Sequence, residues 1–141
     1  MHILTGEYRH ALDAKGRLCI PSRLLKVLGE PIYVFKGPEH CLNVFAADAW
    51  EELAGRLRDL PPTHARKLRR ELFSSALECV PDGQGRILLS PKLREYAGIK
   101  TDAVIAGAEK YAEIWAAAAW DGRDEDESYG SLETAMDLIG L

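Results

Sequence analysis

The sequence of 141 residues contains no apolar run of about 18 residues, the length that a helix needs to cross a membrane. Its first residues, 1–6, also lack the basic segment, apolar core and small-residue cleavage site of a signal peptide. These absences predict a cytoplasmic protein that does not bind membranes.

Metal and disulfide chemistry have little support. Cysteine occurs three times, an odd number, without a Cys-x-x-Cys spacing and mostly beside apolar residues, so we expect reduced, buried thiols. The four histidines show no zinc-ligand spacing, and no metal site is expected. The residues concerned are Cys19, Cys41, Cys79, His2, His10, His40 and His64.

A catalytic constellation is also missing. Nothing in the sequence pairs Glu51, Glu52 or the acidic C-terminal carboxylates with a nucleophile or an oriented histidine. Gly83 and Gly85 lie between two expected strands, which is typical of a hairpin turn and not of a phosphate-binding loop. We therefore expect no enzymatic activity, no catalytic residue and no cofactor.

The sequence does contain a copy of itself. The stretch 12–21 returns as 80–91, with the aspartate, glycine and arginine of Asp-x-x-Gly-Arg repeated at an offset of 69 residues. A long period seen only twice indicates a duplicated half-domain whose two copies share one core. We therefore predict one domain of residues 1–120, with repeats at about 5–53 and 76–120 related by internal pseudo-two-fold symmetry.

Each copy of the motif is expected to form a hairpin, with a glycine in its turn, followed by a short helix and two paired strands. Ser90 and Pro91 are typical of a helix start and predict the helix of the second copy. The later strands are expected at 32–35, 41–45, 103–106 and 113–115, and the short helices at 23–28, 91–97 and 116–120.

Helices between 48 and 75 are expected to join the copies. Asp48 and Glu51 resemble a capping box for a helix reaching about Leu60, and Thr63 is placed to cap a second helix. That second helix, 64–73, has a basic outer side made by Arg66, Lys67, Arg69 and Arg70. This basic side has three possible interpretations: it is exposed to solvent, it contacts phosphate, or it contacts a neighbouring subunit.

Charge is distributed unevenly along the chain. The first hundred residues carry 16 Lys or Arg and 12 Asp or Glu, whereas residues 101–141 carry 2 and 10. A basic body with an acidic end fits an anionic partner for the body. Within the acidic tail, 121–141, Ser131 is placed to cap a terminal helix, which either docks on the body or frays.

The Asp-x-x-x-Arg spacing has a structural and a functional interpretation. Structurally, the aspartate accepts hydrogen bonds from the turn and pairs with the arginine, and we favour this for Asp13, Asp82 and Arg86. Arg17 differs because three cations are close to it in sequence, so the first hairpin is expected to present cations along one edge. These three are Arg9, Lys15 and Arg23.

The two motifs and the stretch that joins them resemble the MraZ family of bacterial regulators, encoded at the head of the division and cell-wall gene cluster. The resemblance covers roughly residues 5–120 and rests on 12–18, 20–23, 66–76 and 82–91. It implies a mainly β fold with α-helices (α+β): a duplicated AbrB-like swapped-hairpin β-barrel with flanking helices. It also implies homo-oligomeric rings, commonly of eight subunits, that bind short direct repeats of double-stranded DNA in their own promoter.

The resemblance implies DNA binding by Arg17, and Lys15 and Asp13 match the same motif. The residues expected to contact DNA are Arg17, Lys15, Arg9 and Arg23, and those expected to shape the motifs are Asp13, Gly16, Asp82, Gly85 and Arg86. The expected function is sequence-specific transcription regulation at the nucleoid. The alternative is an AbrB-like ring that binds protein or RNA, including a neighbouring ribosomal-RNA methyltransferase, and touches DNA nonspecifically.

Overall fold

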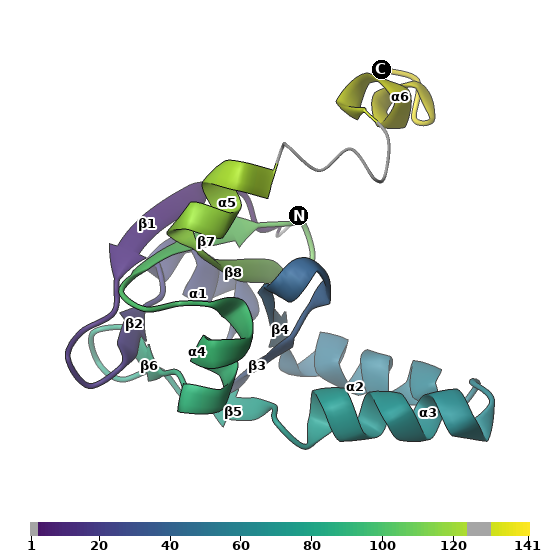
Figure 1. Ribbon diagram of the computed structural model, residues 1–141, viewed down its shortest axis with the longest axis horizontal. Helices are drawn as coiled ribbons and strands as arrows, with labels where there is room; N and C mark the ends of the chain where they lie inside the picture. Colours follow the sequence, from purple (N-terminus) through teal and green to yellow (C-terminus); the bar gives the residue numbers. More distant parts are fainter. Residues whose placement is uncertain (1–2, 124–130) are drawn as a thin grey trace.

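The computed structural model describes residues 3–123 and 131–141, and its elements follow the duplication (Figure 1). The first copy contains β1 (Glu7–Ala11), β2 (Arg17–Cys19), α1 (Ser22–Leu28), β3 (Ile32–Lys36), the 3-10 turn η1 (Pro38–His40), β4 (Leu42–Ala46) and α2 (Ala47–Leu57). The second contains β5 (Leu77–Cys79), β6 (Arg86–Leu88), α4 (Pro91–Ala97), β7 (Asp102–Gly107), β8 (Ala112–Ala116) and α5 (Ala117–Gly122). α3 (Pro62–Leu68) and the π-helical η2 (Arg69–Phe73) join the copies, and α6 (Leu132–Asp137) follows them.

The two copies exchange strands. Six strands form one antiparallel sheet in the order β1-β7-β8-β4-β3-β5, and β2 and β6 form a separate two-stranded ribbon. The first strand of each copy pairs with the third strand of the other, β1 with β7 and β5 with β3. If each strand is replaced by its equivalent in the other copy, the order of the sheet reads β5-β3-β4-β8-β7-β1, which is the same order in reverse. The sheet is therefore symmetric. The expected α+β fold with internal pseudo-two-fold symmetry and swapped strands is confirmed.

The ribbon and the sheet enclose a single core. Leu18 lies opposite Ile87 at the centre of the ribbon, and these two residues are each other's equivalents in the two copies. Both are buried, and they belong to one hydrophobic cluster with apolar residues of β3, β4, β7 and β8 and with the inner faces of α1 and α4. The pseudo-two-fold axis therefore passes through the middle of the ribbon.

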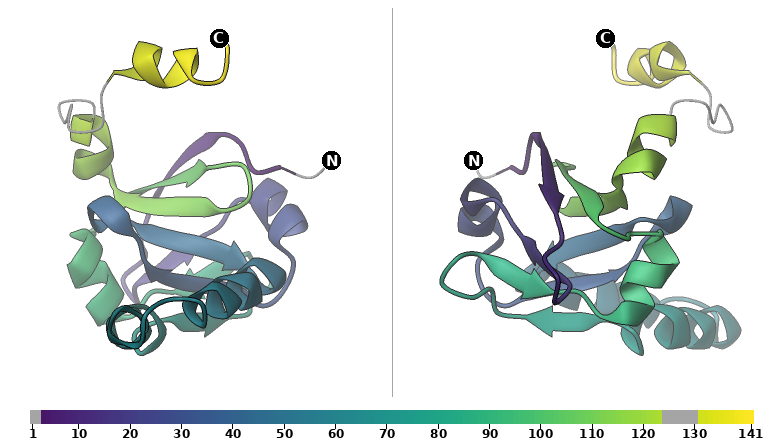
Figure 2. Two further views of the ribbon diagram at one scale, coloured as in Figure 1. Left: turned by 90° about the vertical axis from the view of Figure 1, so that its right-hand side faces the viewer. Right: turned by 60° about the vertical axis from the view of Figure 1, so that its left-hand side comes forward.

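An aromatic cluster holds the helix pair α2 and α3 against the sheet at one end of the molecule (Figures 1 and 2). Trp50 of α2 stacks on Tyr33 of β3, with ring centroids 5.1 Å apart and an interplanar angle of 7°. Phe73 completes the cluster, with its ring centroid 4.5 Å from that of Trp50. Aromatic burial therefore fixes the connection between the copies.

The local turn signals predicted that the two strands of each hairpin pair with each other, and this pairing is wrong, whereas the swapped arrangement implied by the resemblance is right. Backbone hydrogen bonds close the first turn between Asp13 and Arg17, but the N–H of Leu12 then donates to Thr101 O in the other copy. The hydrogen bonds within the turn can form whether the strands on either side pair with each other or with the other copy. The exchange prevails because only the other copy supplies a partner that buries the inner residue of the ribbon.

Helix starts were predicted with mixed success. Ser90 caps α4 and Ser131 caps α6, each accepting a hydrogen bond from the backbone N–H three residues later. The capping box at Asp48 is wrong, because its carboxylate accepts only from the next N–H, at 2.8 Å, and Ala46 is the N-cap residue. α2 ends at Leu57, and α3 begins at Pro62, whose ring suits the first helical position, without a cap from Thr63.

The predicted burial of the cysteines is only partly right, and the position of the C-terminal helix, which the sequence left open, is given by the structure. Cys41 is buried as expected, but Cys19 and Cys79 are only partly buried; all three thiols are free. The side chains of residues 131–141 are exposed, and Figure 1 shows α6 apart from the sheet. The acidic stretch 124–127 lies outside the described residues.

Gly107 of β7 offers a test of the strand exchange. Its N–H donates to Gly6 O, and a Cβ there would lie 2.5 Å from Thr5 N, which is backbone and cannot yield. Gly107→Ala is therefore expected to lower the free energy of unfolding by about 1–3 kcal/mol in denaturant titrations. Gly55→Ala is the control, since nothing lies within 4 Å of its Cβ position and alanine favours the helix by about 0.5–1 kcal/mol. Equal stability of the two variants would contradict this account.

Candidate nucleic-acid interface

The first turn is built around the carboxylate of Asp13. Its Oδ1 accepts the backbone N–H groups of Lys15 and Arg17, each at 2.9 Å, and its Oδ2 accepts Nε of Arg17 at 2.6 Å. Gly16, at φ +82°, completes the turn in a conformation that favours glycine. One side chain thus shapes the turn and orients the arginine that follows it.

The second turn repeats this geometry. Oδ1 of Asp82 accepts the N–H groups of Gln84 and Arg86, each at 2.9 Å, and Oδ2 accepts Nε of Arg86 at 2.8 Å. Gly85 has φ +77°. The structural interpretation of the aspartates therefore applies to both copies, and the arginine pairing expected only for Arg86 holds equally for Arg17.

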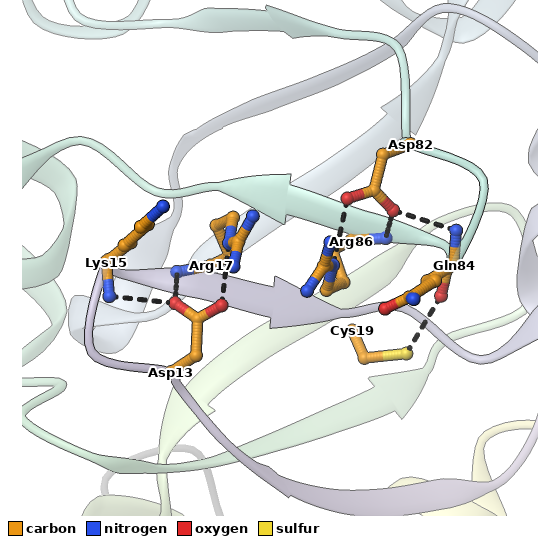
Figure 3. A network of polar contacts seen from close by, with 7 residues as sticks. All are labelled: Asp13, Lys15, Arg17, Cys19, Asp82, Gln84 and Arg86. Atoms are coloured by element: carbon orange, nitrogen blue, oxygen red, sulfur yellow. Dashed lines mark hydrogen bonds and ion pairs between the residues drawn. The ribbon is translucent and has the colours of Figure 1, made fainter.

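Both arginines lie on the outward face of the ribbon formed by β2 and β6 (Figure 3). Strand alternation directs Leu18 and Ile87 inward, so their neighbours in sequence face solvent. In the register, Arg17 lies opposite Leu88, and Arg86 lies opposite Cys19. We call this set, Arg17, Cys19, Arg86 and Leu88, the ribbon face.

The exposure of the two arginines is nearly the same. The side chain of Arg17 is 32% exposed and that of Arg86 is 30% exposed. Within the described part of the chain, each guanidinium has only its aspartate as a hydrogen-bond partner, through Nε. Two terminal nitrogens of each arginine therefore remain as donors for a ligand. The sequence interpretation gave Arg86 no such place, although the internal symmetry predicts it.

Ionisation of the two aspartates follows from their hydrogen bonds. The hydrogen bond from the N–H of Arg17 is the largest cause lowering the pKa of Asp13; desolvation opposes it, and the guanidinium of Arg17 and the N–H of Lys15 lower the pKa further. The N–H and guanidinium of Arg86 lower the pKa of Asp82 in the same way. Both carboxylates are therefore charged at neutral pH.

The other cations expected at the first turn are dispersed. Lys15 is exposed and projects from the turn beside Arg17 in Figure 3. Arg9, in β1, instead contacts Asp121 in α5 at 2.5 Å and Glu7 at 3.5 Å. Arg23 belongs to α1, which packs at the second turn, where Leu25 Cδ1 lies 3.3 Å from a Cβ built on Gly85. Strand exchange therefore corrects the expectation that sequence neighbours share one edge.

Other chemistries find little support in the described residues. Residues 3–123 and 131–141 contain no group of three or more His, Cys, Asp or Glu placed to hold a metal ion. Burial raises the pKa of the Cys41 thiol to about 12, with Glu113 adding to the effect, so this thiol stays protonated. Over the same residues, every helix is too short or too polar to span a bilayer.

Two copies that exchange strands around one sheet and one ribbon, with an aspartate–arginine turn in each copy, define a protein of the duplicated swapped-hairpin class. The family model described as "MraZ protein, putative antitoxin-like" matches residues 3–70 and 72–136, one match for each copy. The chain belongs to the MraZ family, so the resemblance inferred from the sequence is confirmed.

Full-length relatives agree with this assignment. The "Transcriptional regulator MraZ" of Symbiobacterium thermophilum is 48% identical over 133 residues, 93% of this chain and 95% of that protein. The protein of the same name from Desulfitobacterium hafniense is 44% identical over 140 residues, 96% of this chain and 98% of that protein. A third, from Heliobacterium modesticaldum, is 43% identical over 136 residues, 95% of each chain. These relatives are named as transcriptional regulators and not as enzymes, in agreement with the expectation from the sequence.

The aspartate turns predict a specific pH dependence of stability. Asp13→Asn is expected to lower the melting temperature at pH 7, because the folded protein then loses a charged acceptor. The pKa of Asp13 is lower folded than unfolded, so its stabilisation is present above about pH 4 and is lost as the pH falls through the folded pKa. Melting temperatures of wild type and variant should therefore converge in acid. A gap that stays constant, or one equal to that of the control Asp137→Asn on α6, would contradict this role.

Proposed function

We propose that the chain regulates transcription by binding double-stranded DNA through the ribbon face and the first turn beside it, with Arg17 and Lys15 central. The observation that carries the proposal is the placement of two oriented arginines, Arg17 and Arg86, on one outward face of a two-stranded ribbon. The major groove of B-DNA admits such a ribbon, and arginine there binds guanine O6 and N7 in a bidentate manner.

The aspartates favour this role because they hold the arginines before any ligand arrives. A free arginine side chain loses about 2 kcal/mol of rotamer entropy when it is fixed. Anchoring Nε of Arg17 to Asp13 at 2.6 Å removes part of that cost from binding. It also leaves the terminal nitrogens directed away from the carboxylate.

Assembly is part of the proposal, on the strength of the family resemblance. Two or three cations per subunit support only weak binding near physiological salt. A ring, commonly of eight subunits, engaging successive direct repeats would raise the affinity by about 10²–10⁴ through effective concentration. We place the target upstream of the division and cell-wall gene cluster, and the protein in the cytoplasm at the nucleoid. A neighbouring ribosomal-RNA methyltransferase is included as a protein partner.

Arg9 and Arg23 take subordinate places in this proposal. The guanidinium of Arg9 is engaged by Asp121, which raises the pKa of Arg9 and lowers that of Asp121. Arg23 is exposed on α1, the helix whose Leu25 packs at the second turn, and it adds only a supporting positive charge. Neither residue belongs to the ribbon face.

Replacing Arg17 by alanine tests the proposal. Binding to a duplex from the region upstream of the gene cluster is expected to weaken by about 10-fold to 100-fold, because a bidentate base contact contributes about 1–3 kcal/mol. Arg17→Lys should recover little, since lysine lacks the planar fork. Arg86→Ala should weaken binding less, because Gln84 replaces the cation Lys15 at the second turn. Gel shift measures affinity, and light scattering verifies the oligomer.

Arg58→Ala is the matched control, because Arg58 directly follows α2, which packs on β3 and β4 and not on the ribbon. It removes one exposed charge and should leave the affinity nearly unchanged. Undiminished binding by Arg17→Ala, with the oligomer intact, would disprove the site. A smooth footprint without protected repeats would instead support the alternative of a protein- or RNA-binding ring.

A further inference from the structure

The guanidinium of Arg94, from α4 of the second copy, lies against the first turn. A Cβ built on Gly16 would lie 3.1 Å from Cζ of Arg94 and 3.3 Å from each of its two terminal nitrogens. These near-equal distances place the plane of the guanidinium flat against the open side of Gly16. The strand exchange thus brings to Lys15 and Gly16 a cation that lies far away in sequence.

This cation lacks a counter-charge in the described part of the chain. Its Nε is buried and has no hydrogen-bond partner among the described residues. No carboxylate among residues 3–123 and 131–141 forms an ion pair with Arg94, and Asp13 is already occupied by Arg17. A partly buried cation without a partner is unfavourable in the free protein. An anion bound beside it would offset that cost.

The second turn lacks this arrangement. The counterpart of Arg94 is Leu25, whose Cδ1 lies 3.3 Å from a Cβ built on Gly85. The counterpart of Lys15 is Gln84, whose backbone makes the same hydrogen bond to its aspartate. The turns therefore share a backbone and an aspartate–arginine pair but differ by two cations, both at the first turn.

We propose that Arg94 and Lys15 make the first turn a binding site for a phosphate of the nucleic-acid backbone. The difference between Arg94 and Leu25 then decides which of two similar turns contacts phosphate. This inference rests on the proposed function and extends it: Arg17 reads the groove, while Arg94 anchors the backbone beside it. A phosphate contact positions the protein and carries no sequence information.

Salt titration of Arg94→Leu tests the inference. The variant should weaken binding to the upstream duplex and to an unrelated duplex of equal length by the same factor, on the order of tenfold near 0.1 M salt. The slope of log K against log salt should become shallower by about 0.9 for each engaged subunit, because one counterion-releasing contact is lost. Arg94→Lys, which keeps the charge, should retain most of the slope.

Leu25→Arg keeps the inference testable if Arg94→Leu does not fold. The internal symmetry indicates that the fold accommodates arginine at this position, and the added cation should steepen the slope by about 0.9 for each engaged subunit. Arg58→Leu is the control for the loss of one charge away from the ribbon. Unchanged slopes in both Arg94→Leu and Leu25→Arg would overturn the inference, as would a loss of affinity in Arg94→Leu without any change in slope.

The outcomes separate this inference from the proposed function. If Arg17→Ala weakens binding but Arg94→Leu changes neither affinity nor slope, the ribbon face stands and the phosphate site fails. If Arg17→Ala has no effect while the oligomer is intact, the proposed function itself fails. Melting temperatures of each variant identify losses caused by unfolding.

Discussion

The pairing of β2 with β6 is the contact on which the rest of the structure depends. Leu18 and Ile87 face inward from this ribbon and close the core, so each copy supplies a surface that only the other can bury. The same pairing directs Arg17 and Arg86 outward on one face. Core closure and the candidate interface are therefore the two sides of one ribbon.

The two copies share the same turn backbone, and they differ in the side chains that are candidates for contact with a ligand. Each turn is held by an aspartate that accepts two backbone N–H groups and an arginine Nε, with nearly equal distances in the two copies. Lys15 with Gln84, and Arg94 with Leu25, break the equivalence without disturbing the backbone. A duplicated chain can vary such positions independently, which a dimer of identical chains cannot.

Several elements were predictable because their causes are local. The aspartate turns follow from glycine at positive φ and a carboxylate within reach of two N–H groups. Ser90 before Pro91 is sufficient to place the start of α4. The capping box failed for the converse reason: Asp48 lies inside the helix, and the chain enters α2 directly from β4 at Ala46.

The candidate interface was only partly predictable. The sequence indicated Arg17 and Lys15, since both belong to one turn. It grouped Arg9 and Arg23 with them by sequence distance, although Arg9 pairs with Asp121 and α1 packs at the other turn. Arg94 gave no local signal, because its contact with Gly16 spans the two copies.

The sequence by itself determined the duplication, the two aspartate–arginine turns, most helices and strands, and the family. Only the tertiary structure decided which strand pairs with which, and hence which cations share a surface. The reason is physical: turns and caps depend on neighbouring residues, whereas strand partners are chosen by the burial of apolar side chains across the whole core. That choice placed Arg86 beside Arg17, and Arg94 against Gly16.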